Sequence, residues 1–290
     1  MSVNLLKLII TFMPFFELFD ETLDINSTEN YEISVQIGFS GLAYSLIDRL
    51  RNKFIMVRAY EPDPGRSFST VDLEEIFRTD DFLPRRYKAT NIAVNSRKFV
   101  LVPPSLYDPS REKLFFTFNH TDESNTVLLS NEIHNPALFI LFSLQESLHD
   151  ILGNHFPGIH LKHYLVPLFS HIAGSGRASG ENYFHLHADI GFFTLIIFEN
   201  NTLRFCNAFS CKNASDILYH VINVFRQTGT SKEGTLYISG MAERYDNLAP
   251  GFLEYVKSIR YAEPHNGFTF SYVFSEADLS RFLNLFTAAP

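Results

Sequence analysis

The chain has 290 residues, enough for roughly two domains, and its apolar content of 46% supplies a sizeable core. Its 30 Phe and 13 Tyr residues, with no Trp, are spread through every expected element, which indicates core packing rather than a stacking surface for bases or sugars. The net charge of −8 and the absence of a basic run longer than Arg85-Arg86 argue against nucleic-acid binding.

Cysteine usage and the N-terminus indicate the compartment. The two cysteines, Cys206 and Cys211, are too few to stabilise a chain of this length by disulfide bonds, so we expect a reducing, cytoplasmic setting. An apolar run over 5–19 imitates an export signal, but charged residues and a proline interrupt it and no small-residue cleavage site follows. We interpret this run as an edge strand, or as an extension upstream of a start at Met13. The sequence has no stretch of 18 uninterrupted apolar residues, so we predict no transmembrane segment.

The first half opens with a predicted meander of three strands. Strands are expected at 33–37, 42–47 and 54–60, joined by a glycine turn at 38–41 and a polar turn. A short helix should follow over 70–79, because Ser69 is a good N-cap and Asp72 stands three residues later.

The middle of the chain predicts a second group of elements. Two short strands, 92–94 and 99–102, suggest a hairpin, and Pro103-Pro104 ends it. A buried strand at 137–142 should lead into a helix at 144–152, for which Ser143 and Glu146 form an expected capping box. The pattern also predicts apolar stretches at 114–118 and 126–129, a short strand at 159–162 and a helix at 165–173.

The second half begins after a Gly/Ser-rich run at 174–180, which is the predicted domain linker. From Tyr183 to Asp189 apolar and polar residues alternate with the period of a half-buried strand. The turn Asp189-Ile190-Gly191 and an Asn-rich turn then separate two more strands, so that the meander of the first half is repeated. The remaining expectations are strands at 194–198, 203–209, 235–239 and 268–273, and helices at 213–228, 249–258 and 276–286.

These elements predict an α/β protein made of two duplicated β-β-β-α-β-α domains around a cleft. That is the architecture of the actin-like ATPase (ribonuclease H-like) fold of the actin, sugar-kinase and heat-shock-protein superfamily. We expect an N-terminal extension and edge at 1–30, a first domain at 31–175, a second domain at 176–273 and a C-terminal helix at 274–290.

Several segments carry a closer resemblance. FNHT at 118–121, HNPALFILFSLQESLHDIL at 134–152, FPG at 156–158 and the stretch from HLHADIGFF at 185 to SCKNASDILYHV resemble an uncharacterised bacterial family of unknown function, of Bacteroidetes type, with an actin-like ATPase fold. The resemblance covers about Phe19 to the C-terminus. It implies the fold, and no biochemical role is known to us for that family.

The superfamily resemblance implies an ATP site with magnesium in the cleft, where the two meander turns cradle the phosphates. In the first turn Gly38 and Ser40 match, but Gln36 stands where the superfamily has an Asp, and a neutral amide cannot supply the charge that a hard cation needs. The remaining matches are Asp189, Gly191 and Thr194 in the second turn and Gly240 as one glycine of the pair behind the adenosine.

The residues themselves leave alternatives open. Asp189-Ile190-Gly191 is also a competent tight turn with no ligand, and an Asp-x-Gly pattern alone is weak evidence. His185, His187 and Asp189 share one strand face with a spacing that could hold a metal ion, and His160, His163 and His171 are possible further ligands. Otherwise these residues form a polar strand face that lines the cleft.

Three functional hypotheses follow. The first is a non-catalytic or weakly nucleotide-binding scaffold with an unidentified protein partner, by analogy with the actin-like cytoplasmic proteins of type IV pilus and secretion assembly. The second is an ATP-dependent phosphotransferase or ATPase in which Asp48 or Glu181 replaces the missing Asp. The third is a metal-dependent hydrolase that uses His185, His187 and Asp189.

Overall fold

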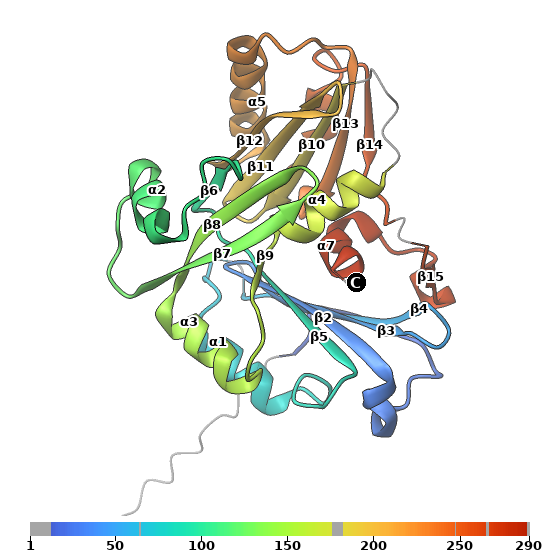
Figure 1. The fold of residues 1–290 in the computed structure, drawn as a ribbon. Coiled ribbons are helices and arrows are strands. Elements are labelled where there is room, and N and C mark those ends of the chain that lie inside the picture. Colours follow the sequence, from blue (N-terminus) through green and yellow to red (C-terminus); the bar gives the residue numbers. More distant parts are fainter. Residues whose placement is uncertain (1–12, 64, 176–181, 247, 265–266, 289–290) are drawn as a thin grey trace, which may run out of the picture.

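A computed structural model describes residues 13–63, 65–175, 182–246, 248–264 and 267–288. Two large twisted sheets lie one above the other with helices between them, and a small third sheet projects to one side (Figure 1). Among these described residues no helix is both long enough and apolar enough to cross a membrane. The expected linker at 174–180 falls almost wholly outside the described residues.

The first sheet contains the first predicted meander. The antiparallel strands β2, β3 and β4 are joined by the predicted turns, and β2 pairs in parallel with β5, which pairs in parallel with β9. Strand β1 lies antiparallel on the outer side of β4, which confirms an edge strand for its four residues. The bounds are β1 (Phe16–Phe19), β2 (Tyr31–Gly38), β3 (Gly41–Asp48), β4 (Lys53–Tyr60), β5 (Ala89–Val94) and β9 (Lys162–His163).

The second sheet repeats this plan. Its order is β12-β11-β10-β13-β14, with an antiparallel meander followed by parallel strands. The strand face with His185, His187 and Asp189 is as buried as the opposite apolar face, so β10 is covered on both sides and is not the half-buried strand that the alternation predicted. The bounds are β10 (Asn182–Asp189), β11 (Phe192–Glu199), β12 (Thr202–Ser210), β13 (Gly234–Gly240) and β14 (Ser258–Tyr261).

A third sheet is inserted between β5 and the helix α3. It consists of β6 (Phe99–Val102), β8 (Ala137–Gln145) and β7 (Thr126–His134) in that order. The hairpin predicted from 92–94 and 99–102 is wrong, because β5 pairs in parallel with β2 whereas β6 pairs with β8 in this other sheet. The apolar stretch at 114–118 belongs to the helix α2 (Glu112–Asn119), which covers the small sheet.

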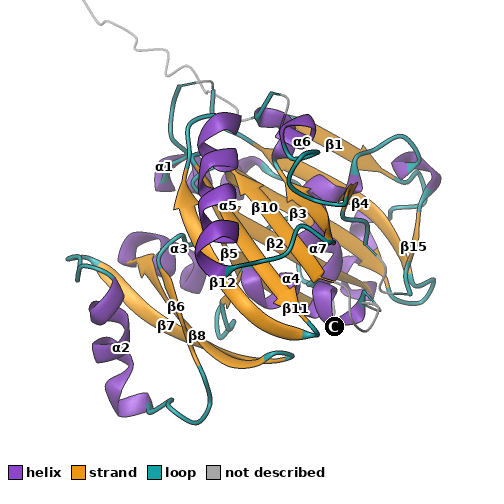
Figure 2. Ribbon diagram, turned by 90° about the horizontal axis from the view of Figure 1, so that it is seen from above, coloured by secondary structure: helices purple, strands orange, loops and turns teal. Residues whose placement is uncertain are grey.

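Helices fill the layers around the sheets. Figure 2 shows α5 (Ala214–Thr228) lying across the outer face of the second sheet, with Ile217, Val221 and Phe225 in the core beneath it. The helices α4 (Leu165–Gly174) and α7 (Leu283–Thr287) lie between the two large sheets, and their apolar residues share one core with β2, β3 and β11. The outer layer of the first half contains α1 (Thr70–Thr79) and α3 (Glu146–His155).

Helix ends test the capping predictions. Ser69 and Asp72 form the capping box of α1, as predicted. The box predicted at Ser143 and Glu146 is wrong: β8 continues to Gln145, so α3 begins at Glu146 without a side-chain cap. Helix α5 begins at its N-cap Asn213 and ends at the left-handed Gly229.

The C-terminal region departs most from the sequence pattern. The expected helix at 249–258 is the single turn α6 (Leu248–Gly251), and the helix expected at 276–286 divides into a 3-10 turn at Leu279–Phe282 and α7. The strand expected at 268–273 is β15 (Thr269–Phe270), which pairs with β4. The chain therefore returns to the first sheet before residue 274, where the second domain was expected to end.

Candidate functional site

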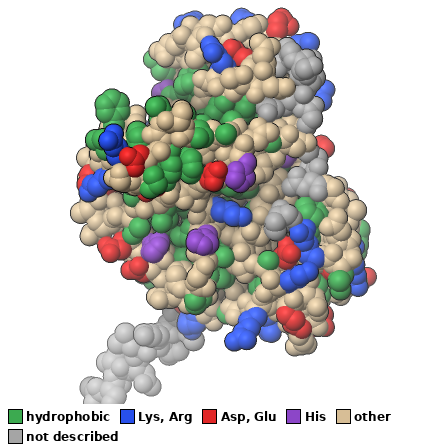
Figure 3. Space-filling model, viewed as in Figure 1, with side chains coloured by type: hydrophobic (Ala, Val, Ile, Leu, Met, Phe, Trp, Pro, Cys, Tyr) green, Lys and Arg blue, Asp and Glu red, His purple; other side chains and the backbone are tan. Residues whose placement is uncertain are grey.

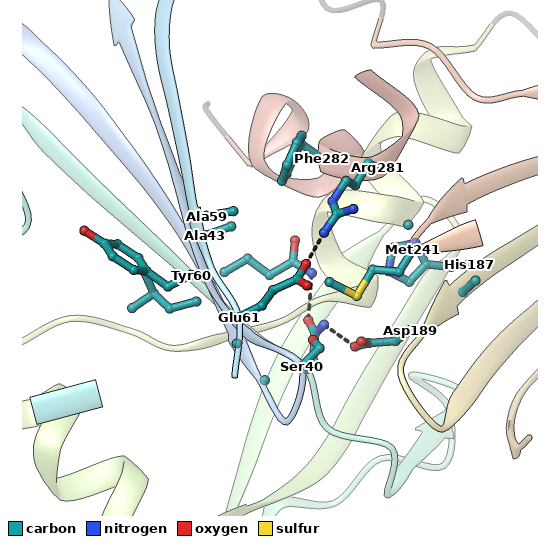
Figure 4. A pocket seen from close by; sticks show the side chains of 17 residues that line it. Ser40, Ala43, Ala59, Tyr60, Glu61, His187, Asp189, Met241, Arg281 and Phe282 are labelled. Carbon is teal, nitrogen blue, oxygen red and sulfur yellow. Dashed lines mark hydrogen bonds and ion pairs between the residues drawn. The ribbon is translucent and has the colours of Figure 1, made fainter. Parts of the chain in front are cut away.

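The two meander turns meet at a small cavity of about 50 Å³ between the large sheets (Figure 4). Four of the residues predicted for a cofactor site line it: Gly38 and Ser40 from the first turn, Asp189 from the end of β10 and Gly240 from the end of β13. The other two, Gly191 and Thr194, do not. The cavity is far smaller than the 300–1,000 Å³ of typical ligand pockets.

Two glycines allow the backbones to approach each other here. Gly240 has a φ of +78°, and a Cβ there would lie 2.1 Å from the carbonyl oxygen of Ala188. Gly41 has a φ of +138°, and a Cβ there would lie 2.0 Å from the carbonyl oxygen of Tyr60. A side chain at either position would push apart strand ends that form the wall of the cavity.

A chain of side-chain amides crosses the cavity from one sheet to the other. Nε2 of Gln36 donates to Oδ1 of Asn95 over 3.1 Å, and Nδ2 of Asn95 donates to Oδ2 of Asp189 over 2.7 Å. The other carboxylate oxygen of Asp189 accepts from the backbone N–H of Ile190. Burial raises the pKa of Asp189, and the hydrogen bonds from Ser40, Asn95 and Ile190 oppose that rise. Gln36, which stands where the superfamily has an Asp, is thus part of this bridge.

A group of ion pairs borders the cavity, and two of its members, Glu61 and Arg281, line it. Glu61, at the end of β4, pairs with Arg281 from the 3-10 turn before α7 and with Arg244 from the loop after β13. Arg281 also pairs with Glu243 in that loop (Figure 4 shows its contact with Glu61). Glu61 and Arg281 are 7% and 13% exposed at their side chains, so both charges are largely desolvated. The first sheet, the second sheet and the C-terminal segment are therefore tied together at one point.

The remaining two predicted site residues have structural partners. Gly191 has a φ of +79° with open space around it, and its carbonyl accepts from the backbone N–H of Cys211. The hydroxyl of Thr194 is buried and shares a hydrogen bond with the hydroxyl of Tyr164, next to α4. Both residues therefore act in the packing of the second sheet and not at the wall of the cavity.

The histidines of β10 are joined through one serine. Nε2 of His185 and Nδ1 of His187 lie 2.8 and 2.9 Å from the Ser239 hydroxyl, and Nδ1 of His185 lies 3.1 Å from the Tyr183 hydroxyl. Burial lowers the pKa of His187 to about 4 and also lowers that of His185, to which the neighbouring His171 and His187 contribute. Both rings are neutral at pH 7, and each bonds to a hydroxyl group. These bonds occupy ring nitrogens that a metal ion would need as ligands.

The described part of the chain contains no set of side chains that could bind a metal ion. No group there brings together three or more His, Cys, Asp or Glu residues in a way that could hold one. Of the possible further ligands, His163 bonds to the carbonyl of Ser96, and His160 is exposed. His171 lies under the second sheet, with its ring centre 6.4 Å from that of His185. The proposed ligand set for a hydrolase is not assembled.

The suggested replacements for the missing carboxylate also do not reach the cavity. Asp48 ends β3, seven residues from Gly41 and roughly 20 Å along the strand, where its Oδ1 caps the turn by accepting from Leu50 and Arg51. Glu181 lies outside the described residues. The carboxylates that line the cavity are Asp189 and Glu61.

Sequence reasoning missed Asn95, Glu61 and Arg281. Asn95 directly follows β5, and polar residues at the carboxyl ends of parallel strands gather at one edge of a sheet. That signal was available once β5 was placed beside β2. Glu61 directly follows β4 in the same way, but Arg281 carries no local signal, because the C-terminal segment reaches the cavity only through the fold.

Comparisons with known proteins agree with this fold. A crystal structure from Bacteroides thetaiotaomicron, of a protein with an actin-like ATPase fold and unknown function, matches with a TM-score of 0.75 and 19% identity over 91% of this chain and 98% of that one. The PilM–PilN type IV pilus biogenesis complex matches with a TM-score of 0.56 and 11% identity over 89% and 97% of the two chains. The chain therefore has the predicted actin-like ATPase fold.

Sequence comparison gives a family but no activity. A family model described as "Protein of unknown function (DUF3822)" matches residues 20–259. A search of curated proteins found no match. The resemblance to a family of unknown function with this fold is confirmed.

Proposed function

The chain belongs to the DUF3822 family, and from its own residues we propose that it is a scaffold that binds a protein partner and does not hydrolyse ATP. The observation that carries this proposal is the bridge from Gln36 through Asn95 to Asp189. It fills with protein side chains the place between the two turns where the superfamily holds phosphates and magnesium.

The chemistry of the bridge argues against catalysis. Mg²⁺ is bound by carboxylates and phosphate oxygens, whereas Gln36 is neutral and its Nε2 is already used as a donor. Asp189 matches the Asp of the superfamily's second turn, but burial raises the pKa of its carboxyl group. One of its oxygens already accepts a hydrogen bond from Asn95. A nucleotide would have to break this bridge and the Glu61–Arg281 ion pair before it could enter.

An exposed apolar surface supports a protein partner. Phe118 and Leu114, four residues apart on α2, are 88% and 63% exposed, and Leu106 in the preceding loop is 64% exposed. Figure 3 shows hydrophobic side chains gathered over α2 and the adjoining small sheet. We call these three residues the α2 surface; apolar patches of this kind mark interaction sites. The structural neighbour PilM is itself described in a complex, with PilN.

Both described cysteines are free thiols, which supports the cytoplasm as the place where the scaffold acts.

Titration with Mg·ATP tests the catalytic half of the proposal. We expect no heat of binding at millimolar ATP and no thermal stabilisation, because a cavity of about 50 Å³ is too small for a nucleotide. A ligand at about 100 times its Kd stabilises a protein by about 2.7 kcal/mol, so ATP with a Kd of about 10 μM would produce that stabilisation at about 1 mM. Stabilisation of the wild-type protein by Mg·ATP would favour the alternative of an ATP-dependent enzyme, because Gly38, Ser40, Asp189 and Gly240 do converge on this cavity.

Variants of the α2 surface test the partner half. We expect Leu114→Ser with Phe118→Ser to abolish retention of one specific protein from a lysate of the source organism, since both side chains are exposed and their loss costs no core packing. Val71→Ser is the matched control, because Val71 is 75% exposed on α1, far from α2 in the chain, and should retain that protein. Equal retention by all three proteins would contradict a role for this surface.

A further inference from the structure

A second and larger cavity, of about 400 Å³, lies beside the closed cleft. Its walls come from the β2–β3 turn, the start of α1, the loop between β5 and β6, and the junction of β8 with α3. Gly38 and Asn95 belong to the walls of both cavities, so the two are neighbours separated by one layer of residues. This volume falls within the range of small-molecule sites.

The interior of the larger cavity is apolar. Ile37 and Leu73 are 1% exposed and form its floor. Phe39 is 62% exposed although it is aromatic, so a large ring is left at the mouth with water on one side. An occupant with an apolar body would remove this surface from water, which is favourable. The apolar lining is Ile37, Phe39, Phe68, Leu73, Leu144 and Leu148.

The rim of the larger cavity carries a positive charge. Lys98 is paired with Glu123, and both line the cavity, so these two charges offset each other. Arg97 is exposed and donates to the neutral hydroxyl of Ser210, and no ion pair among the described residues includes it. The rim therefore offers one guanidinium whose charge is not balanced, next to an apolar chamber. Guanidinium groups bind carboxylates in a two-pronged geometry.

We propose that this cavity is a binding site for a small amphipathic acid, an aliphatic or aromatic body that carries one carboxylate. The apolar body lies against Leu73 and Phe39, and the carboxylate contacts Arg97 at the rim. The proposal uses neither the α2 surface nor the absence of ATP hydrolysis, so it does not rest on the proposed scaffold function.

Calorimetry on the full chain with three probes tests this site. We expect octanoate to bind with a Kd below about 1 mM, whereas acetate lacks the apolar body and should not bind measurably. Octanol has the same body without the charge and should bind at least about tenfold more weakly, because the contact with Arg97 is lost. Equal binding of octanoate and octanol, or no binding of octanoate at millimolar concentration, overturns the proposal.

Two variants place the bound octanoate. Arg97→Ala should weaken octanoate at least about tenfold and leave octanol unchanged, while Arg111→Ala, an exposed arginine outside the cavity, should change neither. Ser147→Trp should block both probes, because Ser147 is exposed at the wall and a larger side chain there enters the cavity without disturbing the core. Octanoate binding that is equal in the wild type, Arg97→Ala and Ser147→Trp shows a different site and rejects the assignment.

Discussion

At the scale of single residues, Asn95 decides how the two halves of the molecule meet. Its amide has one acceptor and one donor group, and it uses the acceptor toward Gln36 and the donor toward Asp189. Both contacts are satisfied together only if residue 36 donates, which an amide does and a carboxylate does not. Gln36 therefore has a structural role of its own. It fixes the orientation of the Asn95 amide, and Asn95 in turn positions the carboxylate of Asp189.

Asn95→Asp should destabilise the protein by about 3 kcal/mol at pH 7.5. The change removes the donor to Asp189 and places a second carboxylate against a buried one. The loss should shrink at pH 5, where the shared site takes up a proton and a donor is restored. Urea denaturation at the two pH values measures both effects. Asn119→Asp, at an exposed position near the end of α2, should change stability by less than about 0.5 kcal/mol, and a similar loss there would contradict the role given to Asn95.

At the scale of elements, local signals explain most helices and the two meanders. The glycine turn after β2, the Asp-x-Gly turn after β10 and the caps of α1 and α5 are all set by residues within four positions of each other. Two helices were misplaced: the Ser143–Glu146 pattern does not cap α3, which begins later than expected, and the C-terminal helix is divided.

Two glycines at helix positions should respond in opposite directions to alanine. Gly229 ends α5 with a φ of +66°, so Gly229→Ala should cost about 1 kcal/mol although space for a Cβ is open. Gly153 is exposed inside α3, has no left-handed φ and leaves open space where a Cβ would lie, so Gly153→Ala should stabilise by about 0.5–1 kcal/mol. Urea midpoints of the two variants measure the contrast, and a shift of the same sign in both would refute it.

The sequence could predict the fold class but not the whole site, for a physical reason. Gly38, Ser40, Asp189 and Gly240 were found because the resemblance to the actin-like superfamily implies a role for the turns and strand ends to which they belong. Arg281 and Asn95 act only after distant segments pack, so no short window of sequence contains their partners. The wrong hairpin has the same origin: a short loop suggested that β5 and β6 pair, whereas β5 finds β2 across more than fifty residues.

At the scale of the whole molecule, buried polar contacts join the two large sheets in addition to the apolar core that the sheets share. The bridge through Asn95 and the ion pairs around Glu61 lie on either side of the small cavity, and α4 and α7 fill the space beyond it. Removing one partner of such a pair leaves a desolvated charge, so single substitutions at these contacts should be strongly destabilising.

Three histidines buried at the junctions between sheets should make the protein sensitive to mild acid. Burial lowers the pKa of His163 to about 3 and that of His187 to about 4, and lowers that of His185 as well. Between these values and the unfolded pKa of about 6.5, the unfolded state binds protons that the native state does not. Stability therefore falls as the pH falls, by about 2 kcal/mol for each of His163 and His187 between pH 7 and pH 5.

The variant His187→Asn isolates one of these contributions. Its overall stability should be lower because of lost packing, but its loss between pH 7 and pH 5 should be about 2 kcal/mol smaller than that of the wild type. His134→Ala, at a histidine whose side chain is 86% exposed, should keep the wild-type loss. The raised pKa of Asp189 acts in the opposite direction, but it is present in all three proteins and cancels in the comparison. Urea denaturation at both pH values provides the measurement, and an unchanged loss in His187→Asn would mean that this ring is protonated in the native state.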